Sequence, residues 1–254
     1  MNDSAVPIRV AGLRTAFGDK VIHEDLDLEV REGEILGLIG GSGSGKSVLL
    51  NTILGLKRPE GGRVELFGED VHGERNVEVA KRTGVLFQYG ALFSALTVQE
   101  NVEAPFLEHL DLPYDLVREL AALKIELVGL DSDAGAKRPA ELSGGMRKRA
   151  GLARAIALDP RILFLDEPTS GLDPIAAGEL DALIRKLRDA LGLTVLMITH
   201  DLDSLYAITD RVAVLADRKV VAVAPVAELE RSDHPWIASY LGGPRGRAAR
   251  KDGH

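Results

Sequence analysis

The segment GGSGSGKS, residues 40–47, has the residue types and spacing of a loop that binds phosphate groups. Glycines let backbone N–H groups turn toward an anion, and a helix that begins there adds the positive end of its dipole. Lys46 would place a charge at the β- and γ-phosphates of a nucleotide, and the hydroxyl of Ser47 would coordinate Mg²⁺. A flexible Gly-Ser turn is the alternative. The phosphate-binding prediction covers residues Gly40, Gly41, Ser42, Gly43, Ser44, Gly45, Lys46, Ser47 and Val48.

Two carboxylates follow the apolar run Ile162-Leu-Phe-Leu165, which is typical of a buried strand. Asp166 and Glu167 would then stand at the carboxyl end of that strand, where open α/β sheets bind their ligands. Asp166 is suited to Mg²⁺, which prefers oxygen ligands, and Glu167 is placed to polarise an attacking water molecule. An acidic turn after a strand is the alternative interpretation.

His200 follows a second apolar run, Thr194 to Ile198, and is predicted at the same edge of the sheet. A neutral imidazole there could donate to a γ-phosphate or orient water, although a single histidine is more often structural. The segment Leu142-Ser-Gly-Gly-Met146 predicts another helix start. Ser143 is a good N-cap, and Gly144 and Gly145 would expose amides at the positive end of a helix, so a second anion site and a plain capped helix both fit.

The elements around these residues predict an α/β fold. Ile35 to Ile39 is apolar throughout and ends in glycines, as a buried parallel strand would, and residues 48–56 favour a helix. Leu26 to Val30 and Arg63 to Phe67 have the alternation of half-buried strands. A helix that opens at Asp173-Pro174 is expected to bury Leu180, Leu183, Ile184 and Leu187. Strands that alternate with helices in this way indicate a sheet covered by helices.

Residues 90–160 have a helical pattern. Thr97 and Glu100 have the spacing of a capping box, and Pro105 is expected to kink or end the helix that they open. The next helix carries leucines at helical spacing and is expected to stop at Gly129. Those leucines are Leu116, Leu120, Leu123 and Leu127.

Composition excludes several other classes. The chain has 254 residues, is 45% hydrophobic and carries a formal charge of -8, which argues against a broad nucleic-acid-binding face. It contains no cysteine, so disulfides and thiolate metal sites are excluded and a reducing compartment is expected. No signal peptide and no apolar run of membrane-spanning length is expected. Any work at a membrane would therefore be that of a peripheral subunit.

Taken together, these motifs resemble the nucleotide-binding domain of ABC transporters. GGSGSGKS is similar to Walker A, ILFLDE to Walker B, LSGGM to the family signature, and His200 to the switch histidine. Gln88 after the strand GVLF resembles the Q-loop, Phe17 the aromatic residue that stacks on adenine, and SGLD, which ends at Asp173, the D-loop. Met146 departs from the glutamine that many members carry, and Ser143 and both glycines remain.

The resemblance implies a P-loop NTPase fold with a RecA-like parallel-sheet core, an N-terminal antiparallel β subdomain and an α-helical signature subdomain. The domain would span residues 6–243, with the helical subdomain at about 90–160. It implies ATP and Mg²⁺ as cofactors, with Ser47, Gln88 and Asp166 at the metal and Lys46, Gln88, Glu167 and His200 in catalysis. Two copies would pair head to tail, so that Ser143, Gly144 and Gly145 of one chain close over the nucleotide held by the other.

A narrower resemblance, over about residues 8–243, is to the ATPases of Mla-type lipid transporters. It implies an integral-membrane permease, an MCE-domain substrate-binding protein, a small STAS-type regulatory subunit, no nucleic acid, and a peripheral position on the cytoplasmic face of a bacterial inner membrane. Leu92 and Phe93 fit a permease contact and burial equally well. The alternatives are an importer of amino acids or other small solutes, a non-transport ABC ATPase, and a subunit that binds ATP without hydrolysing it.

Residues 244–254 are predicted to be a flexible basic tail. Arg245, Arg247, Arg250 and Lys251 could approach anionic lipid, bind a neighbouring subunit, or remain solvated.

Overall fold

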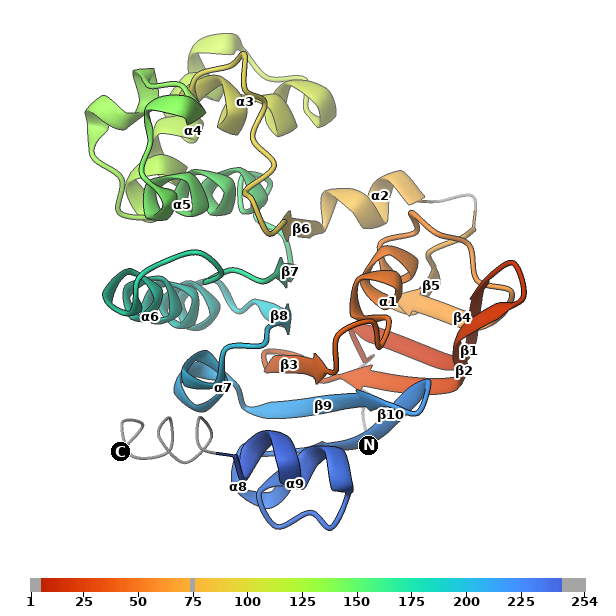
Figure 1. Ribbon diagram of the computed structural model, residues 1–254. Coiled ribbons are helices and arrows are strands. Elements are labelled where there is room, and N and C mark those ends of the chain that lie inside the picture. Colours follow the sequence, from red (N-terminus) through yellow and green to blue (C-terminus); the bar gives the residue numbers. More distant parts are fainter. Residues whose placement is uncertain (1–5, 74–75, 244–254) are drawn as a thin grey trace. The chain divides into compact units, whose positions relative to one another are not determined.

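The structure is a computed structural model that describes residues 6–73 and 76–243. The chain divides into two compact units (Figure 1). Unit 1 consists of residues 1–79 and 194–254, and unit 2 of residues 80–193. The predicted tail lies outside the described residues. In the part of the chain that is described, no helix is at once long and apolar enough to cross a membrane.

Unit 1 begins with an antiparallel sheet in the order β2-β1-β4-β5. Its strands are β1 (Ile8–Phe17), β2 (Lys20–Val30), β4 (Gly61–Leu66) and β5 (Glu69–Asp70). Leu26, Leu28 and Val30 are buried while the residues between them are exposed, which confirms the predicted alternation on β2. This sheet is the expected N-terminal antiparallel subdomain.

The second sheet segment of unit 1 runs in the order β10-β9-β3-β8. The central strand β3 (Ile35–Gly40) pairs in parallel with β8 (Thr194–Ile198) and β9 (Arg211–Ala216), and β10 (Lys219–Ala224) returns antiparallel to β9. Residues 35–39 and 194–198 are all buried, as the two apolar runs predict. Parallel strands of this kind are covered by helices on their faces, which agrees with the burial of β3 and β8.

The described residues of unit 1 form the helices α1 (Lys46–Ile53), α7 (Leu202–Ile208), α8 (Val226–Leu229) and α9 (Pro235–Leu241). The helix α2 (Asn76–Lys81) crosses the boundary between the units. α7, α8 and α9 pack on β3 and β9 through a buried cluster that includes Ile39, Leu205, Val214, Leu229 and Ile237. α1 starts two residues and ends three residues earlier than predicted. Its end is earlier because residues 54–56 form a turn.

Unit 2 contains the parallel strand pair β6 (Thr83–Leu86) and β7 (Ile162–Asp166). Its helices are α3 (Val98–His109), α4 (Tyr114–Leu127), α5 (Gly144–Ala155) and α6 (Pro174–Leu191), with short 3-10 turns at Ser132–Ala136 and Pro139–Glu141. Figure 1 shows α3, α4 and α5 gathered in one bundle, the expected helical subdomain. Leu180, Ile184 and Leu187 of α6 are buried as predicted, and Leu183 is half-buried.

Pro105 is expected to kink or end its helix; it does not end it, because α3 continues past it to His109, and a kink there stays a prediction. Proline removes one intrahelical hydrogen bond. The helix is held instead by a complete capping box, in which Thr97 accepts from the Glu100 amide and Glu100 accepts from the Thr97 amide, and by the buried side chains of Val102 and Phe106. These contacts offset the lost bond.

The leucine row of α4 lies mostly outside the core. Val117, Ala121, Lys124 and Ile125 are the buried residues of this helix, whereas Leu116, Leu123 and Leu127 are exposed. Lys124 is buried because its ammonium group pairs with Asp159. Helical spacing thus predicts the helix correctly, and the turn at Gly129, with φ of 72°, ends it as expected.

Candidate functional site

The segment Gly40 to Ser47 forms a strand–loop–helix turn in unit 1. β3 ends at Gly40, the loop follows, and α1 begins at Lys46 with Gly45 as its N-cap residue. Gly45 has φ of 102°, a conformation that a side chain would strain. No side chain caps α1 and no acidic residue stands in its first turn, so the positive end of this helix faces the loop without a capping side chain.

The Lys46 side chain folds back onto the backbone of this loop. The ammonium group of Lys46 donates to the carbonyl oxygens of Gly40 at 2.8 Å and Gly41 at 3.2 Å. A Cβ at Gly40 would lie 2.5 Å from the carbonyl oxygen of Leu215 and 2.7 Å from the Ser44 hydroxyl. That hydroxyl is buried and has no hydrogen-bond partner in the described part of the chain. The loop therefore packs tightly against Leu215 of β9, and the Lys46 side chain folds back across its backbone.

A hollow of about 340 Å³ opens beside the loop within unit 1. It is formed by the turn between β1 and β2, by the loop itself and by the tip of the β9–β10 hairpin. Its lining residues are Asp19, Lys20, Val21, Ile22, Gly43, Ser44, Asp217 and Arg218. Phe17, the residue predicted to stack on adenine, ends β1 with its side chain 59% exposed, and the ammonium group of Lys57 stands 4.8 Å from its ring centre.

His23 is a residue of this site that the sequence motifs do not indicate. It is fully buried on β2, and its Nδ1 and the hydroxyl of Thr15 are 2.8 Å apart. The other ring nitrogen, Nε2, is buried without a hydrogen-bond partner among the described residues. A Cβ at Gly45 would lie 2.4 Å from Nε2. The imidazole thus fills the space directly against the phosphate loop.

His200 also belongs to unit 1, just after β8. Its carbonyl oxygen accepts from the hydroxyl of Tyr240 on α9 at 2.9 Å, and its side chain is exposed. Tyr240 stacks on Trp236, with ring centres 4.8 Å apart, and the indole nitrogen of Trp236 would lie 3.4 Å from a Cβ at Gly41. One short helix therefore contacts both the phosphate loop and the backbone at His200.

Unit 2 holds the other predicted site residues. Gln88 lies just beyond β6, and β7 ends at Asp166 with Glu167 next. Glu167 has φ of 52°, an uncommon left-handed conformation for a glutamate. Its carbonyl oxygen accepts from the Ser170 amide at 3.2 Å and from the ammonium group of Lys148 at 2.8 Å.

Lys148 on α5 connects two of these residues, because its ammonium group also donates to the carbonyl oxygen of Gln88. The side chain is buried, and this burial lowers the pKa of Lys148 to about 8 against the opposing effect of the Glu167 and Asp166 carboxylates. No motif pattern marks this lysine.

The predicted helix cap at Ser143 is confirmed, since its hydroxyl accepts from the Met146 amide at 3.2 Å. A Cβ at Gly145 would meet nothing within 4 Å, so that side of the helix start is open. Asp173 caps α6 by accepting from the amides of Ile175 and Ala176, each at 3.0 Å. Ser143 and Asp173 therefore each cap a helix of unit 2.

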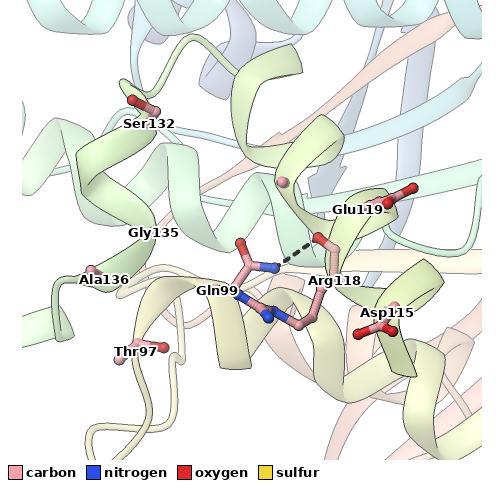
Figure 2. A pocket seen from close by; sticks show the side chains of 9 residues that line it. Thr97, Gln99, Asp115, Arg118, Glu119, Ser132, Gly135 and Ala136 are labelled. Carbon is pink, nitrogen blue, oxygen red and sulfur yellow. Dashed lines mark hydrogen bonds between the residues drawn. The ribbon is translucent and has the colours of Figure 1, made fainter. Parts of the chain in front are cut away.

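A separate cavity of about 680 Å³ lies among α3, α4 and the 3-10 turn at Ser132–Ala136 (Figure 2). Gln99 crosses it and donates to the carbonyl oxygen of Arg118 at 2.9 Å. Asp115 and Glu119 add acidic groups to its lining, and none of the predicted site residues takes part in it.

The phosphate loop and the surrounding α/β fold define a nucleotide-binding ATPase of the P-loop type. A sequence model described as "ABC transporter" matches residues 23–170, which is more than half of the chain. The chain belongs to the ABC transporter family. It is an ABC ATPase, and it binds ATP.

Relatives and solved structures extend this result. The chain is 42% identical over 239 residues to the intermembrane phospholipid transport system ATP-binding protein MlaF of Haemophilus influenzae, covering 93% of this chain and 90% of that one. It is 39% identical over 254 residues to the probable ribonucleotide transport ATP-binding protein mkl of Mycobacterium tuberculosis, covering 97% and 70%. It also resembles the dimeric post-hydrolysis state of the ATP-binding cassette MJ0796 bound to ADP and Pi, with a TM-score of 0.78, 28% identity and coverage of 86% and 98%.

The buried His23 makes stability dependent on pH. Burial, with a smaller contribution from Lys57, lowers the pKa of His23 from 6.5 to about 4. The folded chain therefore keeps this imidazole neutral while the unfolded chain protonates it below about pH 6.5. We expect its contribution to the free energy of unfolding to be full above that pH and to fall by up to about 1.4 kcal/mol per pH unit toward pH 4.

Urea unfolding of the wild-type chain and of His23→Leu, measured from pH 7.5 to 5, checks this expectation. The difference in unfolding free energy between the two proteins should shift in favour of the variant as the pH falls. A difference that stays constant over this range would show that the pKa of His23 is the same in the folded and unfolded chain, and would contradict the expectation.

Proposed function

We propose that this ATPase energises a membrane transporter of phospholipid or another hydrophobic substrate, working with Mg²⁺ and as a pair of identical chains. The observation that carries the nucleotide part is the uncapped start of α1 with Lys46 folded over the loop. The lipid part is supported by 42% identity, over nearly the whole length, to a relative named for phospholipid transport. The ATPase would then lie at the cytoplasmic face of a bacterial inner membrane.

The phosphate site has the chemistry that ATP requires. Amides of residues 45–48 and the ammonium group of Lys46 provide donors and positive charge for phosphate oxygens. The buried hydroxyl of Ser44, which has no partner in the structure, is a further donor at the same loop. In the free chain Lys46 donates to the carbonyls of Gly40 and Gly41, and we propose that it exchanges these for phosphate oxygens.

We assign the metal-binding groups to Ser47, Asp166 and Gln88, all oxygen ligands of the kind that Mg²⁺ prefers. When bound, Mg²⁺ would neutralise charge on the β- and γ-phosphates. Glu167 would polarise the attacking water, and His200 would orient it. Phe17 would stack on the adenine ring. Most of the catalysis would come from positioning and charge stabilisation, as in other phosphoryl transfers.

We further propose a head-to-tail pair, in which Ser143, Gly144 and Gly145 of one chain approach the nucleotide bound by the other, with Asp173 nearby. The resemblance to a dimeric cassette supports this arrangement. The start of α5 leaves room for this approach, because a Cβ at Gly145 would meet nothing within 4 Å. A permease, an MCE-domain protein and a STAS-type subunit complete the proposed assembly.

Replacement of Glu167 by Gln tests the hydrolytic assignment. Removal of the carboxylate should lower kcat by at least about 100-fold, while the neutral amide keeps ATP bound. Phosphate release and retention of radiolabelled ATP on the purified protein measure the two effects. Glu179→Gln is a matched control, because Glu179 is an exposed residue of α6 whose partner is Arg149 of α5. Rapid hydrolysis by the Glu167 variant would remove the assigned role.

A second candidate substrate comes from the relative named for ribonucleotide transport, which is 39% identical to this chain. Purification of the intact complex from membranes separates the two. Phospholipid carried by an MCE-domain partner is the result expected for the lipid proposal. A copurified solute-binding protein that contains nucleotide or another polar solute would contradict it and leave the ATPase assignment intact.

A further inference from the structure

One face of α5 lies along the segment that follows Gln88. Lys148, Gly151 and Arg154 are spaced three residues apart, so they share this face of the helix. Lys148 is only 5% exposed. α5 is also the helix that begins at Ser143, so the residues proposed to meet a partner's nucleotide stand on the same rigid element.

Lys148 binds two main-chain carbonyls that come from different strands. Its ammonium group donates to the carbonyl oxygen of Gln88, beyond β6, and to that of Glu167, beyond β7, the latter at 2.8 Å. A buried ammonium group is costly unless such acceptors surround it. The lysine therefore fixes the backbone of Gln88 and Glu167 to each other and to α5.

The neighbouring residues on this face make the connection rigid. A Cβ at Gly151 would lie 2.8 Å from Leu86 and 3.1 Å from Gly90, so the helix backbone rests directly on this segment. Arg154 donates to the carbonyl oxygens of Ala91 at 2.8 Å and Gly90 at 3.0 Å. Three main-chain carbonyls between residues 88 and 91 are thus held by cations of α5.

Glu167 needs this support more than most residues would. With φ of 52°, its backbone is in a region that a glutamate seldom adopts and that persists only where the surroundings impose it. Lys148 contacts the carbonyl of this residue directly. Loss of the contact would let the Glu167 backbone relax, which would move the carboxylate away from its working position.

We propose that Lys148 is a positioning residue for ATP hydrolysis. It keeps the side chains of Gln88 and Glu167 in a fixed relation to each other and to the helix that starts at Ser143. This inference rests on the hydrolytic role proposed above for Glu167, and it adds a residue that does not itself touch ATP.

Lys148→Met keeps the length and apolar character of the side chain and removes the donor. We expect kcat for ATP to fall about 10- to 100-fold, since misplacement by about 1 Å is enough for such a loss, while KM changes less than about threefold. Lys148→Arg, which restores a charged donor, should recover most of kcat. Steady-state phosphate release over a range of ATP concentrations measures both constants.

Lys186→Met is the matched control, because Lys186 is an exposed lysine on α6 and should behave as wild type. Should Lys148→Met fail to fold, Lys148→Gln is compared with Lys148→Arg, and the arginine variant should have the higher kcat at similar KM. Wild-type kcat in Lys148→Met, or an arginine variant no better than the uncharged one, would overturn the inference. Absence of hydrolysis by the wild-type chain would instead contradict the proposed function.

Discussion

The proposed phosphate site, in which backbone amides hold phosphate oxygens, would constrain much of unit 1. Such amides are available only at a helix start that nothing else caps, and the turn before it needs φ of 102° at Gly45. The space beside that glycine is filled by His23, which Thr15 holds in one orientation. A buried parallel strand, β3, fixes the other end of the loop at Gly40. The strand, the glycines and the buried imidazole all serve one short segment of backbone.

In unit 2, main-chain carbonyl groups hold the backbone around Gln88 and Glu167 in place by accepting from Lys148. Gln88 and Glu167 follow two neighbouring parallel strands, and loops at such positions have no ladder to hold them. Lys148 supplies the donor that both carbonyls accept. The same helix carries the open glycine start at Ser143, so its orientation and the position of Glu167 depend on each other. A cation is used here because one ammonium group can reach two acceptors from different directions.

The sequence predicts the local features of this fold well and the long-range ones poorly. Strand–glycine loop–helix order, the Thr97 capping box and the Ser143 cap depend on neighbours a few residues apart, and the structure has all three. Pro105 does not end its helix, because tertiary packing and a good cap outweigh one missing hydrogen bond. Lys148 and His23 gave no signal, since their partners are 60 and 8 residues away and only folding brings them together. The roles of the site residues remain proposals that their geometry supports.

The most direct test of the central claim, an ATP site completed by a second copy, combines two inactive chains. Lys46→Ala disables the phosphate loop, and Ser143→Asp keeps a good N-cap while placing a negative charge where a phosphate should lie. Each variant alone should hydrolyse ATP poorly. Mixed pairs contain one site with an intact loop from one chain and an intact Ser143 from the other, so phosphate release should recover on mixing. A mixture as inactive as its components would contradict the shared site.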